Sequence, residues 1–397
     1  MIPADTAAWG ASKSGIRELA AYGAMRRAEI GAEKVFDFSI GNPSIPAPPC
    51  VNAAILEALK LPSEELHGYT PAAGLPSLRA KIADYRNRLF GGSLRAENIY
   101  VTCGAAAALA ISMRAILMPG DEVIAITPFF PEYRVFVEAA GGQLVAVSSR
   151  EDDFQIDFDA LFAAINERTK AVIINSPNNP SGVVLGEESV KKLAAALAQS
   201  EAKFGSRIYL ICDEPYRELV YEDVIVPCAT RYYDNSIVCY SFSKSLSIPG
   251  ERLGYIAVCE NMAEGEAIFS GIAGAGRALG YVNPPSLFQH VIESCLGETS
   301  DISKYAENRA LIYDGLCALG FTCIKPDGAF YLFMKSPESD AKRFSETAKR
   351  FELLLVPADD FGTPGYVRIA YCVSRESIVR SMAAFELLAR EYGLLKK

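Results

Sequence analysis

Short apolar runs alternate with longer amphipathic stretches through the middle of the chain. Seven runs are mainly apolar and contain many β-branched and aromatic residues: IYVT, EVIAITP, QLVAVSS, KAVIINSP, RIYLICDEPY, SIVCYSFSK and RLGYIAVC. Helical periodicity occupies the stretches between several of them, after Gly104, from Pro131, near Asp157 and from Glu187. Continuous apolar strands that alternate with helices are typical of a mostly parallel sheet covered by helices on both faces.

The two ends of the chain follow other patterns. Residues 12–31 predict a helix that leads into the extended arm FDFSIGNPSIPAPP, whose prolines are incompatible with a helix or a central strand. Helices are also expected over residues 51–61 and 75–90. After Glu260, helices are expected around residues 261–279, 284–297 and 301–319, and then the short strands FTCIKP, YLFMK, LLLVPA and YVRIAYC and two more helices.

These patterns predict an α/β chain with two domains. A large domain over residues 47–285 would carry the mostly parallel sheet, and a smaller α+β domain would span residues 286–397. Residues 1–46 would form an N-terminal arm that joins the small domain. A chain of 397 residues, half of them hydrophobic, is long enough to bury the core of two such domains.

Charge and hydropathy narrow the classes of partner. The net charge is −9 and no run is rich in lysine or arginine, so nucleic acid and anionic membranes are not expected as partners. The first residues lack a charged segment followed by an apolar one, and the longest apolar run, residues 105–118, contains Arg114 and is too short to span a bilayer. We therefore expect a soluble cytoplasmic protein.

The sequence lacks the motifs of several common classes of site: redox cysteine pairs, metal sites, catalytic triads and nucleotide-binding loops. The ten cysteines form no C-x-x-C pair and are expected to be reduced thiols in the core. His67 and His290 stand apart from each other, so no metal site is expected and a Ser–His or Cys–His triad is disfavoured. Neither a G-x-G-x-x-G nor a G-K-[ST] phosphate loop occurs.

The stretch SIVCYSFSKSLSIPGERLG places a lysine where an apolar strand ends. Lys244 follows that strand directly, and burial there would lower its pKa and favour the neutral amine that attacks carbonyl groups. Ser241, Ser243 and Arg252 are donors of the kind that hold a phosphate. A solvated lysine at the end of a surface strand is the alternative.

Polar residues follow other predicted strands at the edge where parallel sheets bind ligands. Asp213 ends IYLIC, and NSPNNPSG follows KAVII. Gly104 separates a strand from a helix, whose free N–H groups suit a phosphate. Arg368 lies within the apolar strand YVRIAYC and must be paired there. Taken singly, these residues would also fit an N-cap aspartate, a bare loop, a good helix start and a structural salt bridge.

The spacing S-x-S-K-(x7)-R-x-G-Y resembles the cofactor-lysine signature of the class I/II aminotransferases that use pyridoxal phosphate (PLP), the aspartate-aminotransferase-like family of fold type I. Matching segments recur in order from Gly41 to Arg368, so the resemblance covers nearly the whole chain. It implies the fold-type-I arrangement of a large PLP-binding domain and a small domain.

The resemblance also implies how each matching residue would meet the cofactor. Lys244 would bond PLP covalently and act as the catalytic acid and base, Asp213 would partner the pyridine nitrogen, and Tyr216 and Asn179 would bond the phenolic oxygen. Phe130 would stack on the ring. The residues expected at the phosphate are Gly104, Ala105, Ala106, Ser241, Ser243 and Arg252. Many relatives place a polar side chain in the loop that reads VTCGAAAAL here.

Substrate and subunit contacts follow from the same resemblance. Arg368 would grip the α-carboxylate of the substrate with both arms of its guanidinium, with help from Asn179 and the backbone of Gly41. Tyr69 would reach the phosphate of a neighbouring subunit, which implies a homodimer with shared active sites.

The expected reaction moves an amino group from an L-amino acid to a 2-oxo acid by a ping-pong mechanism. A PLP-dependent C–S β-lyase or decarboxylase is the alternative, because Arg368 and Asn179 would serve it equally. A PLP-binding transcription regulator is disfavoured, since about forty residues precede Gly41 without a basic patch or helix-turn-helix spacing. The substrate side chain stays open: Arg277, Arg17 or Lys13 would suit a second carboxylate, and Phe129, Tyr133 or Ile40 an apolar group.

Overall fold

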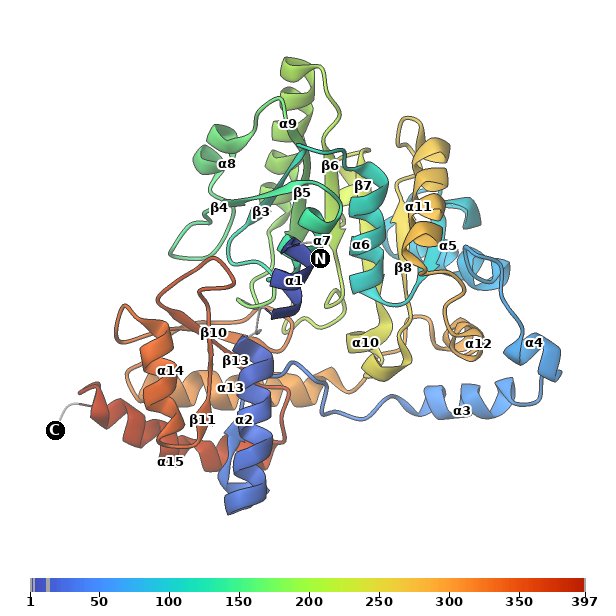
Figure 1. Cartoon of the computed structure of the whole chain (residues 1–397). Helices are drawn as coiled ribbons and strands as arrows, with labels where there is room; N and C mark the ends of the chain where they lie inside the picture. Colours follow the sequence, from blue (N-terminus) through green and yellow to red (C-terminus); the bar gives the residue numbers. More distant parts are fainter. Residues whose placement is uncertain (1, 3, 12–14, 396–397) are drawn as a thin grey trace.

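The computed structural model describes residues 2, 4–11 and 15–395. Its central feature is a seven-stranded sheet with the order β2-β8-β7-β6-β5-β3-β4 (Figure 1). The strands are β2 (Ile99–Thr102), β3 (Glu122–Ile126), β4 (Gln143–Val147), β5 (Thr169–Asn175), β6 (Tyr209–Asp213), β7 (Ser236–Ser241) and β8 (Gly254–Val258). β8 runs antiparallel to β2 and β7 and the other pairs are parallel, so the predicted mostly parallel sheet is confirmed.

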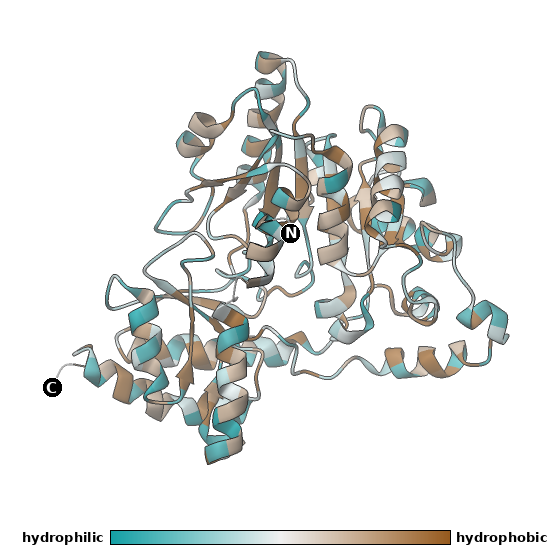
Figure 2. Cartoon of the chain, viewed as in Figure 1, coloured by the Kyte–Doolittle hydropathy of each residue, from teal (hydrophilic) through white to brown (hydrophobic). Residues whose placement is uncertain are grey.

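Side-chain alternation along the strands builds two apolar layers, one on each face of this sheet. On β5, Ala171 and Ile173 belong to the layer that includes α6, α7 and α11, while Val172 and Ile174 belong to the layer that includes α5, α9 and α12. The strands are brown in the hydropathy view, as expected for a sheet buried on both faces (Figure 2). The helices around the sheet are α3 (Pro49–Ala58), α4 (Ser63–His67), α5 (Pro76–Phe90), α6 (Ala105–Ile116), α7 (Glu132–Ala139), α8 (Phe158–Ala164), α9 (Glu187–Phe204), α10 (Phe242–Ser245), α11 (Gly265–Leu279) and α12 (Ser286–Cys295).

A second, four-stranded antiparallel sheet has the order β12-β13-β10-β9. Its strands are β9 (Thr322–Ile324), β10 (Tyr331–Lys335), β12 (Val356–Pro357) and β13 (Tyr366–Ala370), and its helices are α13 (Ile302–Ala318), α14 (Ala341–Lys349) and α15 (Arg375–Glu391). Figure 1 shows these elements beside the large sheet, at lower left. The mixture of helices and antiparallel strands matches the α+β pattern predicted for the C-terminal part.

Helix α12 packs against helices of the large sheet rather than against the small one. Phe288, Val291 and Ile292 belong to the same apolar cluster as residues of α3 and α5. The boundary expected after residue 285 stays a prediction, and this packing favours grouping residues 286–295 with the large domain.

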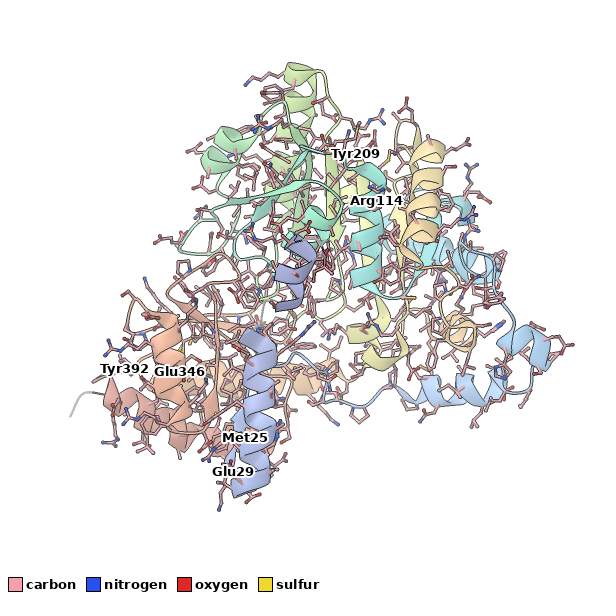
Figure 3. The ribbon with its side chains drawn as sticks, viewed as in Figure 1. Met25, Glu29, Arg114, Tyr209, Glu346 and Tyr392 are labelled. Atoms are coloured by element: carbon pink, nitrogen blue, oxygen red, sulfur yellow. The ribbon has the colours of Figure 1, made fainter. Side chains whose placement is uncertain are left out.

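The N-terminal part pairs with the C-terminal part of the chain in a separate two-stranded sheet. Helices α1 (Ala4–Ala11) and α2 (Gly15–Ile30) precede β1 (Phe36–Asp37), which pairs in parallel with β11 (Leu353–Leu354). α2 directs Met25 and Glu29 outward from the fold (Figure 3). The 3₁₀ turns are Ala32–Lys34, Ala96–Asn98, Ala229–Arg231 and Pro249–Glu251. Among the described residues, no helix has the combination of length and apolar character that crossing a membrane requires.

Candidate functional site

Three neighbouring strands end at one edge of the large sheet. In the parallel register Asn175 pairs with Asp213, and Asp213 pairs with Cys239. β7 ends two residues further on, and the one-turn helix α10 then carries Lys244. Ser241 caps this turn by accepting a 3.2 Å hydrogen bond from the backbone N–H of Ser243. The fold therefore brings the lysine and the aspartate to the same edge.

A cavity of about 280 Å³ opens at this edge. Twelve of the residues expected at the site line it: Gly41, Ala105, Ala106, Phe130, Asn179, Asp213, Tyr216, Ser241, Ser243, Lys244, Arg252 and Arg368. Six further residues line it that the sequence did not single out for this site: Ile16, Leu109, Asn175, Pro215, Pro249 and Tyr331.

Lys244 is buried within this cavity. Its Nζ donates a 2.7 Å hydrogen bond to the carbonyl oxygen of Gly41 and lies 5.5 Å from the centre of the Phe330 ring. Burial is the main cause that lowers the pKa of the amine from 10.5 to about 8, and Arg252 and Arg368 lower it further. A much larger fraction of this amine is therefore neutral near physiological pH than of an exposed lysine, which the solvated-lysine alternative does not explain.

Asp213 is 4% exposed, and only one of its two carboxylate oxygens has a hydrogen-bond donor. Its Oδ2 accepts a 2.5 Å hydrogen bond from the hydroxyl of Tyr133 and a 3.4 Å contact from Asn175 Nδ2, whereas its Oδ1 has no partner. Burial raises the pKa of this carboxyl to about 7, with a further increase from Glu214, while the Tyr133 hydrogen bond lowers it. A buried carboxylate oxygen without a donor is costly and suits a ligand that brings one.

Tyr133 and Asn175 are polar partners of Asp213 whose contacts the sequence did not predict. Tyr133, one of the residues expected to suit an apolar substrate group, does not line the cavity, and its hydroxyl bonds Asp213 instead. Phe129 and Ile40, for which the same role is expected, do not line the cavity either: Phe129 is 3% exposed in the core, and Ile40 is 46% exposed.

Of the cations considered for a second carboxylate, Arg17 lines a neighbouring cavity of about 500 Å³, and Arg277 is exposed on α11. Lys13 lies outside the described residues.

One end of the cavity is built to receive an anion. Gly104 caps α6 with φ of +83°, and a Cβ there would meet the Arg252 guanidinium at 2.8 Å. Arg252 bonds the carbonyl oxygens of Cys103 and Pro249 and lies 3.4 Å from the hydroxyl of Ser243. Ala105 and Ala106 of the first turn of α6 line the cavity, and a helix leaves the N–H groups of its first turn without intrahelical partners, so they are available to an anion. Gly104 itself does not line the cavity but shapes the turn beside it.

Arg368 occupies another part of the cavity wall and is 2% exposed. Its Nη1 donates a 3.2 Å hydrogen bond to Asn179 Oδ1, its Nη2 bonds the carbonyl oxygen of Ser39, and its Nε is buried without a partner. Burial lowers the pKa of its guanidinium below the usual range of an arginine. In the part of the chain that the structure describes, these contacts of Arg368 are with an amide and a carbonyl rather than a carboxylate, so the alternative of a structural salt bridge is not observed.

The arm around Gly41 closes the cavity against Tyr331. The hydroxyl of Tyr331 lies 3.0 Å from that of Tyr216, and a Cβ at residue 41 would overlap the Tyr331 hydroxyl. Residue 41 must therefore be glycine for the arm to approach so closely. Asn178 has a structural role, since its Oδ1 accepts hydrogen bonds from the backbone N–H and the hydroxyl of Ser181.

One further residue expected at the cofactor, Tyr69, lies outside the cavity. Its side chain is 97% exposed. Within the described residues, no group of three or more His, Cys, Asp and Glu side chains is arranged to hold a metal ion. All ten cysteines are free; six are buried, three are half-buried and Cys317 is exposed, so Cys317 departs from the core thiols expected.

The architecture and the lysine-bearing cavity define a fold-type-I transferase. The chain belongs to the family of class I and II aminotransferases, whose model matches residues 33–385. An amino transferase from Eubacterium rectale has a solved structure with a TM-score of 0.97 and 52% identity, covering 99% of each chain. The aspartate/prephenate aminotransferase of Thermus thermophilus is 31% identical, covering 87% of this chain and 88% of its own, and the aspartate aminotransferase of Pyrococcus horikoshii is 29% identical, covering 89% and 90%. The chain is therefore an aminotransferase.

Proposed function

We propose that this aminotransferase uses PLP and that the cavity around Lys244 is its active site. The observation that carries the proposal is the presence, in one cavity, of a lysine amine with its pKa near 8 and a buried carboxylate oxygen of Asp213 without a donor. The amine suits an aldehyde, and the carboxylate suits a protonated ring nitrogen. The N-terminus of α6 and Arg252 suit a phosphate. The residues present fit the cofactor.

Each part of the cavity then has a task. Lys244 would bond PLP, Asp213 would face its ring nitrogen, Phe130 would cover the ring, and Tyr216 and Asn179 would approach its phenolic oxygen. The phosphate would be held by residues of the α6 turn and the α10 region: Gly104, Ala105, Ala106, Ser241, Ser243 and Arg252. When bound, PLP supplies an electron sink for negative charge at the substrate Cα.

The protein's own groups orient the substrate and move its proton. Arg368 has an unpartnered Nε and would bind the α-carboxylate through its guanidinium fork, with Asn179 beside it. The arm at Gly41 excludes water from the lysine side. The Lys244 amine would take the proton from the substrate Cα as a general base and would then donate it as a general acid. A pKa near 8 permits both roles at neutral pH. An amino acid and a 2-oxo acid would enter the same cavity in turn, so ping-pong kinetics are expected.

The lyase and decarboxylase alternatives would use Arg368 and Asn179 in the same way. The relatives reported above are all named as aminotransferases, and this favours transfer over elimination. We also propose a homodimer in which Tyr69 reaches a neighbouring active site, because so exposed a tyrosine suits a contact between subunits. The cytoplasmic location stays a prediction.

The test compares Lys244→Ala with Lys304→Ala, an exposed lysine of α13. The purified wild-type protein and the control should show the visible absorbance of lysine-bound PLP and should transfer amino groups from an L-amino acid mixture to pyruvate, oxaloacetate or 2-oxoglutarate. Lys244→Ala should lose both, with turnover reduced by at least about 10⁴-fold. Full activity in Lys244→Ala would disprove the site. Release of ammonia and pyruvate from cystathionine without an acceptor would instead support the lyase.

A further inference from the structure

Tyr331 lines the cavity and has no task in the proposed function. It begins β10 of the second sheet and is 3% exposed. Two residues further along β10, Phe333 pairs with Arg368 of β13, and side chains two residues apart lie on the same face of a strand. Tyr331 and Arg368 are therefore diagonal neighbours on one face of this sheet.

The ring of Tyr331 lies against the guanidinium of Arg368. The Cζ of Arg368 is 4.7 Å from the ring centre, and both side chains are buried. A cation over an aromatic face is attracted to it, and the attraction is stronger where water is excluded. A guanidinium that stacks by its face keeps the N–H groups of its edge available for hydrogen bonds. The ring therefore fixes the plane of the fork that would bind the substrate α-carboxylate.

The hydroxyl of Tyr331 lies 3.0 Å from the hydroxyl of Tyr216. Tyr216 follows β6 of the large sheet, so this contact joins the two sheets. The two rings meet edge to face, with centres 5.7 Å apart and an interplanar angle of 84°, which fixes their relative orientation. A tyrosine hydroxyl has one proton to donate and can also accept. When Tyr331 donates to Tyr216, the proton of Tyr216 stays available to an oxygen within the cavity.

The same hydroxyl limits the approach of the arm at Gly41, where a Cβ would overlap it. The carbonyl of Gly41 in turn accepts the hydrogen bond from Lys244. One side chain thus contacts the arginine expected at the substrate, the tyrosine expected at the cofactor and the arm beside the lysine.

We infer that Tyr331 is a positioning residue of the reaction. Its ring orients Arg368 toward the substrate α-carboxylate, and its hydroxyl orients Tyr216 toward the phenolic oxygen of the cofactor. This inference rests on the proposed function, because it uses the tasks given there to Arg368 and Tyr216. The two contacts are separable by substitution, since phenylalanine keeps the ring and leucine keeps neither group.

A second cluster of the same composition supplies a matched control. Tyr221 has the Cζ of Arg309 4.7 Å from its ring centre and accepts a 3.1 Å hydrogen bond from the hydroxyl of Tyr371. Tyr221 is 2% exposed, and none of these three residues lines the cavity. Substitutions at Tyr221 therefore report the loss of packing and hydrogen bonding away from the site.

The hydroxyl is tested by the pH midpoint of the visible band of lysine-bound PLP in each holoenzyme. When lysine-bound PLP loses the proton of the nitrogen that joins it to the lysine, the negative charge on the phenolic oxygen is no longer balanced beside it. A donor at that oxygen favours the deprotonated form and lowers the midpoint. Tyr331→Phe should therefore raise the midpoint by roughly 0.5–1 pH unit, and Tyr221→Phe by less than about 0.2 unit. An unchanged midpoint in Tyr331→Phe, or an equal rise in Tyr221→Phe, would overturn the role of the hydroxyl.

The ring is tested by the half-saturation concentration of an amino acid in single-turnover reactions of the holoenzyme. L-Alanine, L-aspartate and L-phenylalanine are tried with the wild type, and the one with the highest kcat/KM is used for the variants. Tyr331→Leu should raise the half-saturation concentration about tenfold, whereas Tyr331→Phe and Tyr221→Leu should stay within about twofold of wild type. Equal values for Tyr331→Leu and wild type, or a tenfold rise in Tyr221→Leu, would overturn the role of the ring.

The failure of the inference differs from that of the proposed function. A wild type without the visible band, or with a band that none of the three amino acids changes, would overturn the proposed function itself. Tyr331→Phe preserves the buried ring, so its pH midpoint decides the role of the hydroxyl even if the leucine variant does not fold.

Discussion

The hydroxyl of Tyr133 donates a 2.5 Å hydrogen bond to Oδ2 of Asp213, so that Oδ1 of the same carboxylate is left without a donor. The tyrosine comes from α7 and the aspartate from the end of β6, two elements separated by β4, α8, β5 and α9 in the chain. Occupying one oxygen fixes the carboxylate and reserves the other oxygen for a ligand. A hydrogen bond from the tyrosine also favours the ionised carboxylate, against the effect of burial.

Tyr133→Phe should weaken both cofactor binding and catalysis. The variant removes a hydrogen bond to a buried carboxylate, which typically contributes about 1.5–3 kcal/mol, so kcat/KM should fall roughly 10- to 100-fold. The pKa of Asp213 should rise further, because this hydrogen bond lowers it in the wild type. Titration of the cofactor-free protein with PLP measures the loss of cofactor binding. Steady-state assays across pH 6–9 measure the fall in kcat/KM and the shift in its pH dependence.

Tyr209→Phe is the matched control, since Tyr209 is a buried tyrosine at the opposite end of β6 (Figure 3). Equal losses of activity in the two variants would show that Tyr133 acts only through packing.

Asp213→Asn should raise the stability of the cofactor-free protein and lower the activity of the enzyme. Burial raises the folded-state pKa of Asp213 from 3.8 to about 7, so its favourable contribution is present at pH 4 and is lost as the pH rises through about 7. The variant carries no charge there, so it should be more stable than wild type at pH 8, by up to roughly 4 kcal/mol at 1.4 kcal/mol per pKa unit. At pH 4 the two should be similar. Catalysis should fall at least about 10³-fold.

Denaturant unfolding of both cofactor-free proteins at pH 4, 6 and 8 measures this difference, with Asp360→Asn, an exposed position, as the control. A wild type that is the more stable protein at pH 8 would contradict the account of Asp213 as a strained carboxylate.

The rate of covalent PLP attachment should follow the titration of Lys244. The amine must be neutral to attack, and a pKa of about 8 leaves about one-tenth of the amines neutral at pH 7, against roughly 3 in 10,000 for a pKa of 10.5. The rate should rise with pH and level off above about 8. Stopped-flow absorbance after mixing cofactor-free protein with PLP measures it. A free lysine amide, whose rate continues to rise above pH 10, is the control; the same profile for the protein would show that burial does not tune Lys244.

Arg368→Lys should raise the KM for amino acids and leave PLP binding intact. A lysine keeps the charge but loses the planar fork and the hydrogen bond to Asn179, so kcat/KM should fall about 100-fold. The control is Arg309→Lys, a buried arginine of α13 that pairs with Glu222. A loss of PLP affinity equal to the loss of activity would place Arg368 at the cofactor rather than at the substrate.

Much of the site could be predicted because it follows from local features of the chain. Asp213 and Lys244 each come directly after an apolar run, and neighbouring parallel strands must end at the same edge of a sheet. Gly104 and Gly41 stand where a helix begins and where an arm approaches closely, and glycine is the residue that permits both. These relations need only strand direction, helix starts and turn chemistry.

The partners of these residues could not be predicted in the same way. Tyr331 reaches the site from a strand of the second sheet, and α12 packs with α3 although the sequence pattern groups it with the C-terminal part. Tyr133 is simply a tyrosine on an amphipathic helix until α7 is packed on the sheet. Such contacts join segments far apart in the chain, and local periodicity carries no information about them.

By itself, the sequence determined the order of strands and helices, the mostly parallel sheet and the polar residues at its edge, because hydrophobic periodicity and turn residues act over a few positions. Only the tertiary structure decided which oxygen of Asp213 stays free, which carbonyl Lys244 contacts and that Ile16, Leu109 and Phe130 share one cavity. Those outcomes depend on how separate elements pack, since the packing sets the burial that shifts each pKa and the distances that join each pair.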